Sequence, residues 1–295
     1  MDHKQIKQST KDGYDMRLTK LNNGQSIDNY AFLYDIDVIM DKISKFTAGT
    51  QRNYIISIVQ ALRDVPVMKS MYEAYSEIMN QFNADLKVNN TKSIKQEANW
   101  VDQNQIDFVF KKLLDENLYL LCYKRSSITQ TNWSSVTDTV LLALYVLQPP
   151  RRILDYMAMV IVKKLPKTLD PDINYYALDT DTFTFQNYKT SGTYNTQTVV
   201  APSKLATLLE CYVKISRSQY MISKYDGSPY TKSFYITRIL NKIFKKELGK
   251  SISVSMLRNI YLTDKFGSKI KELSSTAASM GTSSATIQNN YVKID

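Results

Sequence analysis

Residues 175–202 contain the only sequence in this chain that is typical of β-strands, so the fold has to be built mainly from helices. YYALDTDTFTFQNYKT (175–190) and TQTVVAP (196–202) alternate, are rich in Tyr, Phe, Thr and Val, and flank a turn at Ser191 and Gly192. Elsewhere apolar residues recur every three or four positions, which is the period of an amphipathic helix. We therefore expect a mainly α protein with one small antiparallel, hairpin-rich sheet.

The same pattern predicts two domains and two connecting segments. Residues 1–26 are polar with no apolar period, and indicate a flexible N-terminal arm. Three or four amphipathic helices make residues 27–86 a small all-α domain, and residues 87–99, nearly devoid of apolar side chains, indicate a linker. Residues 100–295 then form a larger domain of helices around the sheet. The helices expected in the chain cover 28–46, 50–65, 68–87, 100–123, 134–148, 151–164, 203–218, 231–249, 253–267, 270–281 and 283–294.

Two prolines and two arginines, PPRR at 149–152, precede the apolar run ILDYMAMVIV, which is apolar enough for a buried helix. Proline suits the first turn of a helix. Cations do not, because the helix dipole is positive at that end. The arginines are therefore either solvated on a loop or part of an anion-binding site.

The composition excludes several classes of enzyme. The single histidine, His3, lies in the polar N-terminal segment, so a Ser-His-Asp triad, a Cys-His dyad or a His-ligated zinc site is not expected inside the fold. No phosphate-binding P-loop and no G-x-G-x-x-G motif is present, which disfavours ATP-driven and dinucleotide chemistry. Cys122 and Cys211 form no C-x-x-C motif, and we expect buried free thiols in a reducing compartment.

The chain has no apolar run long enough to span a bilayer and no signal peptide at its N-terminus, so we expect an intracellular protein without a membrane segment. Its charge is unevenly distributed. The formal net charge is +10, and residues 201–295 hold 15 Lys and Arg against 6 Asp and Glu, a net charge of +9. Such a concentration favours a polyanionic partner, above all nucleic acid, over a generally basic protein without such a partner.

Four features of the second domain follow one another in a fixed order. They are R-x-x-D (Arg152 to Asp155), Lys189-Thr190 beside the strand turn, S-M-L-R (Ser255 to Arg258) and M-G-T-S-S-A-T-x-x-x-x-Y (Met280 to Tyr291). This order resembles the R…K…HxxR…(H/W)…Y pattern of the tyrosine recombinase, or phage integrase, family. The resemblance covers about residues 26–295 and implies a helical core-binding domain followed by an α+β catalytic domain. The composition and the PPRRxLDY variant resemble family members from large DNA viruses and their mobile elements, which would place the protein in the host cytoplasm or nucleus.

The resemblance assigns roles position by position. Arg152 matches the first arginine because Asp155 follows three positions later, and Asp155 would orient an arginine. The remaining matches are the sheet lysine Lys189, the second arginine Arg258, Thr282 at the H/W position and Tyr291 as the nucleophile. The family usually has His where this chain has Ser255, and His or Trp where it has Thr282. The Ser255 and Thr282 hydroxyls can still hydrogen-bond a phosphate oxygen, but proton donation to the leaving group would depend more on Lys189.

The implied reaction cleaves and rejoins DNA through a 3′-phosphotyrosyl intermediate, with no metal, cofactor or ATP. Guanidinium groups suit this reaction because they bind phosphate oxygens bidentately and stay charged. Two alternatives remain open. One is a type IB topoisomerase-like enzyme that relaxes DNA, and the other is an architectural DNA-binding protein that has lost catalysis.

The expected partner is double-stranded DNA, closed in a clamp by the two domains. Because only four residues follow Tyr291, too few for a free helix, we expect a monomer in solution and a homotetramer on paired DNA sites. Further residues expected to contact DNA are Arg52, Arg63, Arg151, Thr190, Lys245 and Lys246.

Overall fold

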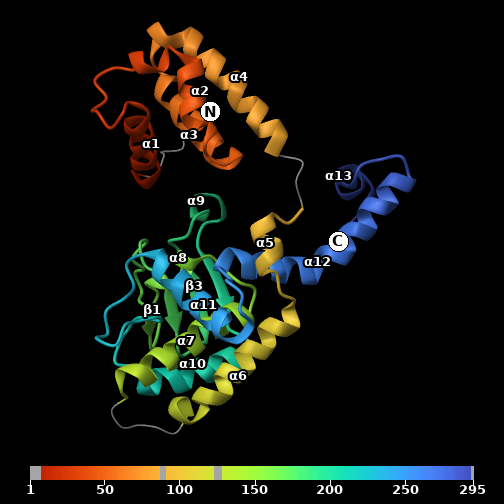
Figure 1. The fold of residues 1–295 in the computed structure, drawn as a ribbon. Coiled ribbons are helices and arrows are strands. Elements are labelled where there is room, and N and C mark those ends of the chain that lie inside the picture. Colours follow the sequence, from red (N-terminus) through yellow and green to blue (C-terminus); the bar gives the residue numbers. More distant parts are fainter. Residues whose placement is uncertain (1–7, 87–90, 123–127, 294–295) are drawn as a thin grey trace. The chain divides into compact units, whose positions relative to one another are not determined.

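The computed structural model describes residues 8–86, 91–122 and 128–293, and the chain divides into two compact units (Figure 1). The division falls between Thr91 and Lys92, within the predicted linker 87–99. Residues 87–90 lie outside the described residues. Residues 91–93 are irregular, but Ile94–Asn99 forms helix α5, whose first turn is capped by the Ser93 hydroxyl.

Unit 1 is a bundle of helices with its own apolar core. The core is formed by residues such as Ile39, Ile55 and Ile58, all fully buried. The predicted helices at 28–46, 50–65 and 68–87 correspond to three of its elements. In chain order the elements are α1 (Gln8–Leu21), η1 (Ala31–Leu33), α2 (Ile36–Ser44), α3 (Ala48–Leu62), η2 (Pro66–Met68) and α4 (Lys69–Leu86).

The prediction of a flexible arm over residues 1–26 is wrong for α1. Leu18 and Leu21 of this helix are 2% and 3% exposed and belong to the core of unit 1, and the Lys42 ammonium donates to the Leu21 carbonyl at 2.9 Å. Apart from Tyr14 and the exposed Met16, the rest of the helix is polar, so its apolar contact is too narrow to produce a visible period in the sequence. Residues 1–7, including His3, lie outside the described residues.

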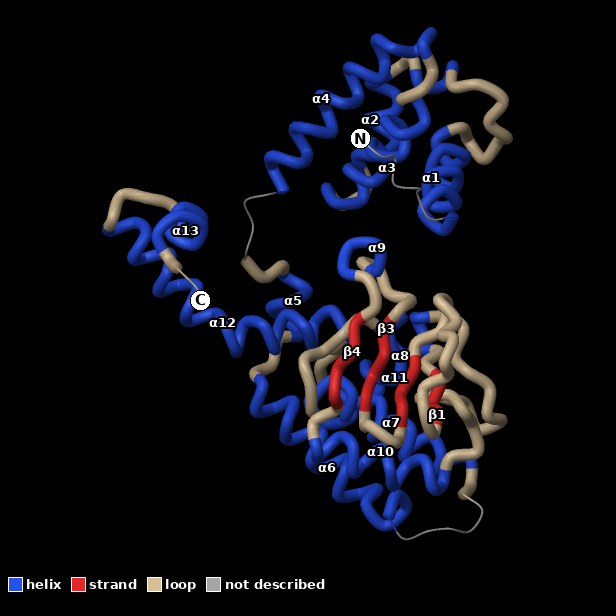
Figure 2. Tube along the Cα trace, turned by 180° about the vertical axis from the view of Figure 1, so that it is seen from behind, coloured by secondary structure: helices blue, strands red, loops and turns tan. Residues whose placement is uncertain are grey.

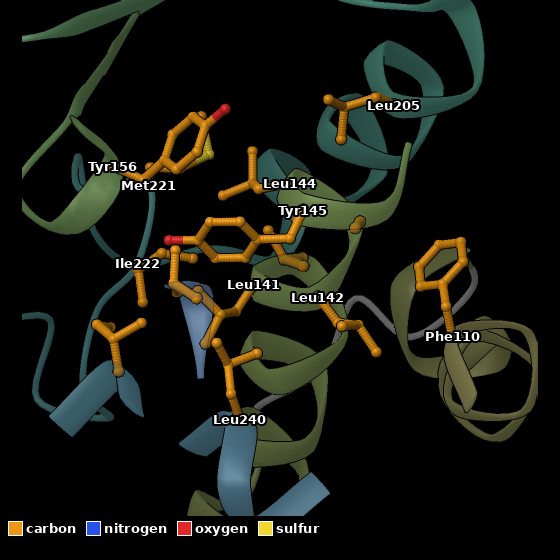
Figure 3. Close-up of a cluster of buried hydrophobic side chains, with 14 of the residues drawn as sticks. Phe110, Leu141, Leu142, Leu144, Tyr145, Tyr156, Leu205, Met221, Ile222 and Leu240 are labelled. Atoms are coloured by element: carbon orange, nitrogen blue, oxygen red, sulfur yellow. The ribbon is translucent and has the colours of Figure 1, made fainter. Parts of the chain in front are cut away.

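Unit 2 is built around α7 (Gln130–Val146), in which every residue from Val136 to Tyr145 is buried. Figure 3 shows Leu141, Leu144 and Tyr145 of this helix in the centre of the apolar cluster, with Tyr156 beside them. The Tyr145 and Tyr156 rings meet edge to face, 5.7 Å between centroids. The other helical elements are α6 (Gln103–Cys122), α8 (Ile153–Met157), α9 (Ser191–Tyr194), α10 (Ser203–Ile215), α11 (Ser233–Leu248), α12 (Val254–Ser279), α13 (Ser284–Thr286) and the π-helical segment η3 (Ile287–Tyr291).

The sheet of unit 2 has four strands in the order β1-β2-β3-β4 (Figure 2). They are β1 (Val160–Val162), β2 (Tyr175–Ala177), β3 (Thr182–Phe185) and β4 (Gln197–Val200). Pairs β2–β3 and β3–β4 are antiparallel, whereas β1 runs parallel to β2. The prediction of a mainly α fold with a small sheet is confirmed, but the sheet is mixed rather than antiparallel.

Strand β1 lies where the sequence predicts a helix over residues 151–164. Helix α8 ends at Met157, and Val160–Val162 pairs with Tyr175–Ala177 of β2. Three β-branched residues in succession favour a strand once a partner strand is available. That partner lies at another point in the chain, so the local apolar run alone does not reveal it.

The C-terminal part of unit 2 also differs from prediction. The segments expected as two helices, 253–267 and 270–281, form the single 26-residue helix α12, which continues through Gly267. Both views show α12 leaving the body of unit 2, with α13 at its far end (Figures 1 and 2). In the described part of the chain, no helix combines the length and apolarity that crossing a bilayer demands.

Candidate active site

Three arginines from two distant parts of the sequence line one cavity of about 360 Å³ in unit 2. Arg151 and Arg152 lie between α7 and α8, and Arg258 is in the second turn of α12. The remaining lining residues come from the ends of α7 and α8, from β3 and β4, and from the loop that joins those strands. They are Gln148, Pro149, Pro150, Asp155, Tyr156, Phe185, Tyr188, Thr190, Tyr194, Gln197 and Val199.

Arg151 is the most firmly held of the three arginines. Its Nε donates to Asp155 Oδ2 at 2.8 Å and its Nη1 donates to Gln197 Oε1 at 3.0 Å. Its guanidinium carbon lies 3.7 Å from the ring centroid of Phe185 and 5.4 Å from that of Tyr188. These contacts come from α8, β3, β4 and the intervening loop, so several elements fix a single guanidinium.

Asp155 therefore pairs with Arg151, and not with the arginine three positions before it. Arg151, one of the residues expected to contact DNA, has a side chain that is only 21% exposed. Arg152 precedes α8 as its N-cap residue and makes no side-chain capping bond. Helix α8 begins at Ile153, so neither proline occupies the first turn.

Burial raises the pKa of the Asp155 carboxyl above its ordinary value, while the Arg151 guanidinium and, to a smaller extent, the charge and backbone N–H of Arg152 act in the opposite direction. The side chain of Asp155 is 3% exposed and its Oδ1 atom has no hydrogen-bond partner among the described residues. Burial also lowers the pKa of Arg258, and the nearby guanidinium groups of Arg152 and Arg151 lower it further. The three cations are thus close enough to destabilise one another, which an anion in the cavity would relieve.

The loop between β3 and β4, which contains Lys189, carries Tyr188, Thr190 and Tyr194 to this cavity. Asn174 holds the start of the loop. Its amide donates to the backbone carbonyls of Asp155 and Asn187, and its Oδ1 accepts from the backbone N–H of Gln186 and of Asn187. Further along, the Tyr188 hydroxyl donates to the Asn195 carbonyl at 2.6 Å. Thr190 lines the cavity, and the Lys189 side chain is exposed beside it.

Asn174, Gln197, Phe185 and Tyr188 support the site, and the sequence pattern does not single them out. Their roles depend on contacts with α8 and the arginines, which are distant in sequence. The strand alternation does place Phe183 and Phe185 on one face of β3. It does not show that the Phe185 ring lies against a guanidinium.

Tyr291 and Thr282 lie at the other end of α12. From Arg258 to Ser279 this helix runs for about 31 Å at 1.5 Å per residue. Thr282 follows the helix, and the side chain of Tyr291, at the end of η3, is 64% exposed. Ile287 is buried, and the Ser284 hydroxyl lies 3.5 Å from that of Ser274, so this segment packs back on the last turns of α12.

The structure thus assembles Arg151, Arg152, Asp155, Thr190 and Arg258 around one cavity. Lys189, Thr282 and Tyr291 do not line it, although Lys189 precedes Thr190 in the same loop. Ser255 is exposed one turn before Arg258 and does not line the cavity. Three tyrosines absent from the predicted set do line it. Tyr156 and Tyr188 are buried, whereas Tyr194, on α9 in the loop between β3 and β4, is 62% exposed.

The other residues expected to contact DNA lie in varied surroundings. In unit 1, Arg52 Nε donates to Asn83 Oδ1 at 2.5 Å, and Arg63 is exposed at the end of α3. In unit 2, Lys246 is within ion-pair distance of Glu116 and Glu247, so part of its charge is compensated. Lys245 is exposed in the last turn of α11. Among the residues that the structure describes, no cluster of His, Cys, Asp and Glu suits a metal ion.

No protein-family model and no curated protein sequence matches this chain. Among solved structures, the crystal structure of XerA recombinase aligns with 86% of this chain and 84% of that chain, at 11% sequence identity and a TM-score of 0.39. At this identity and TM-score the alignment decides neither the fold nor the activity, so the functional conclusion has to come from the site itself.

Proposed function

We propose that the protein is a site-specific DNA recombinase that cleaves and rejoins strands through a phosphotyrosyl intermediate. The observation that carries this proposal is the convergence of Arg151, Arg152 and Arg258 on one cavity, beside a loop with Lys189. A diester phosphate in a strand-transfer reaction needs its non-bridging oxygens neutralised, and preorganised guanidinium groups supply that neutralisation. The four motifs in the order of the tyrosine recombinases, together with the basic C-terminal third, support the same reaction.

In the proposed reaction the phosphate binds to the arginines, the Tyr291 phenol gives up its proton to solvent, and its oxygen attacks phosphorus. The bond from phosphorus to the 5′-oxygen breaks as the new bond forms, and the Lys189 ammonium gives its proton to the leaving oxygen. Attack by a 5′-hydroxyl of another strand reverses these steps. The phosphotyrosyl intermediate is itself a phosphodiester, with the tyrosyl ester in place of the 5′ ester, so rejoining needs no ATP.

The position of Tyr291 adds a condition to this reaction. Because α12 separates Tyr291 from Arg258, the tyrosine reaches a bound phosphate only if the C-terminal segment rearranges or if it serves a second copy of the chain. A mixture of Tyr291→Phe and Arg258→Ala chains distinguishes these routes. If the mixture cleaves DNA, Tyr291 of one chain attacks a phosphate bound by the arginines of another. If the mixture is inactive, Tyr291 reaches the arginines of its own chain by rearrangement.

The decisive experiment is incubation with a nicked suicide duplex, followed by denaturing electrophoresis to detect protein joined to DNA. We expect an adduct with the unaltered chain and none with Tyr291→Phe, at nearly unchanged DNA affinity, because only the attacking oxygen is removed. Tyr194→Phe is the matched control, since Tyr194 is similarly exposed but lines the arginine cavity. Loss of the adduct in Tyr194→Phe alone would mean that Tyr194, and not Tyr291, is the nucleophile.

The distance between Tyr291 and the cavity favours one second candidate, a DNA-binding protein without strand cleavage. Such a protein would bind duplex DNA through the same basic residues and would form no adduct in either the unaltered chain or the variants. The suicide duplex therefore separates the two candidates directly.

A further inference from the structure

The two cysteines of this chain lie side by side although 89 residues separate them in sequence. Cys122 is the last residue of α6 and Cys211 lies in α10, and their Sγ atoms are 3.5 Å apart. Both are free thiols in this structure. The expectation of two buried thiols is wrong, because Cys122 is exposed and Cys211 is only partly buried.

The packing of α6 against α10 holds this pair in place. Leu121, adjacent to Cys122, is 3% exposed. Leu208, one turn before Cys211, and Tyr212, next to it, are 8% and 0% exposed. All three belong to the core of unit 2. A disulfide has an S–S distance of about 2.05 Å, so the sulfurs need to approach by only about 1.5 Å. Cys122 ends its helix, where a side chain can turn without breaking a regular segment.

We propose that Cys122 and Cys211 are a redox-reactive pair that closes to an intramolecular disulfide when a peroxide oxidises it. This property is independent of the proposed DNA chemistry. The exposed Cys122 thiolate attacks one peroxide oxygen and becomes a sulfenic acid, while the other oxygen leaves as water. The Cys211 thiolate then attacks the Cys122 sulfur and releases a second water. In sum, two thiols and one hydrogen peroxide give one disulfide and two waters.

The surroundings of Cys122 make the reaction dependent on pH. Partial desolvation of its sulfur and the Cys211 thiol raise the pKa of Cys122, and the nearby Lys214 ammonium acts in the opposite direction. The net shift is upward, so the reactive thiolate is scarce at neutral pH. The rate of closure therefore rises as the pH increases toward the raised pKa.

The bond would join α6 to α10 and close a loop of the chain that contains Arg151, Arg152 and Lys189. Cross-links of this kind stabilise mainly by restricting the unfolded chain. None of the arginine-cavity residues contacts either sulfur in the interactions described above. We therefore expect oxidation to raise the thermal midpoint of unit 2 while the arginine cavity keeps its DNA affinity.

The test treats the full chain with hydrogen peroxide at pH 7 and pH 8.5 and measures the intact mass under denaturing conditions. We expect a loss of about 2 Da, equivalent to two hydrogens, faster at the higher pH, with both thiols lost to alkylation. Trypsin should then yield residues 113–124 linked to residues 205–214. Reduction with a dithiol should restore the original mass and both free thiols.

Cys122→Ser and Cys211→Ser are the matched controls. Neither can lose two hydrogens internally, and the Cys211→Ser chain should accumulate oxygen on Cys122 because its resolving thiol is absent. Circular dichroism of both variants confirms that they fold. A disulfide-linked dimer as the main product of the unaltered chain, or oxygen added to Cys122 while Cys211 stays free, would overturn the proposal.

Discussion

Replacing Arg151 with alanine tests whether this residue, rather than Arg152, stabilises the charged form of the buried Asp155 carboxyl in the folded protein. The substitution removes the 2.8 Å ion pair with Asp155 and the stacking on Phe185. Removing one member of a buried ion pair commonly costs about 3–5 kcal/mol, because the other charge remains buried without compensation. We expect a loss of stability in this range at pH 7.

The pH dependence follows from the direction of the Asp155 pKa. That pKa is raised in the folded chain, chiefly by burial, so folding favours the protonated carboxyl and stability falls as pH rises through the interval between the ordinary and the raised pKa. Arg151 opposes this loss. Without it the pKa rises further, so the difference between the unaltered chain and Arg151→Ala is greatest at neutral pH and shrinks toward acid pH, where Asp155 is protonated in both.

Urea unfolding followed by tryptophan fluorescence is the appropriate assay, because both tryptophans, Trp100 and Trp133, lie in unit 2. Arg152→Ala is the matched control, with an expected loss below about 1 kcal/mol. Adding Asp155→Asn to Arg151→Ala should recover part of the stability by removing the stranded charge. Equal losses for the two arginines, or a difference that does not change between pH 7 and pH 5, would refute this reasoning.

Three further predictions concern the site and the N-terminal helix. Arg152→Ala and Arg258→Ala should each lower the rate of adduct formation by about 10²–10³, the scale for loss of one preorganised contact to a developing charge, and unchanged rates would remove the arginines from the reaction. Lys189→Ala should cleave poorly but recover on a substrate with a 5′-thiol leaving group, which needs little protonation; a lack of rescue would mean that Lys189 is not the acid. Leu21→Ala should destabilise unit 1 by about 2–5 kcal/mol in thermal unfolding followed by circular dichroism, whereas Met16→Ala, at an exposed position of the same helix, should not; equal effects would contradict the packing of α1.

Much of the secondary structure can be predicted from the sequence because its signals are local. The period of apolar residues in 28–46 and 68–87 predicts helices of unit 1, and the alternation in 175–190 predicts β2 and β3. Prediction fails where too few apolar residues face the core to give a period, or where a segment takes its structure from a partner strand distant in sequence. Helix α1 contributes only Leu18 and Leu21 to the core, and Val160–Val162 becomes a strand because β2 lies beside it.

The candidate site divides in the same way. The amino-acid types and their order indicate a phosphate-binding group with Arg152, Lys189 and Arg258, since side-chain chemistry is fixed by the residue itself. The partner of Asp155 is not fixed by sequence, because Arg151 and Arg152 are both within reach of its carboxylate. The fold decides in favour of Arg151, since Phe185 provides a ring and Gln197 an acceptor for its guanidinium.

By itself, then, the sequence determines the mainly helical composition of this protein, its basic C-terminal third and the identity of the groups that can neutralise a phosphate. Tertiary structure alone decides that three arginines share one cavity, that two thiols 89 residues apart lie at 3.5 Å, and that α12 carries Tyr291 away from Arg258. The physical reason is that helical period and side-chain charge are properties of neighbouring residues. Which groups meet depends on how segments distant in the chain bury their apolar faces together.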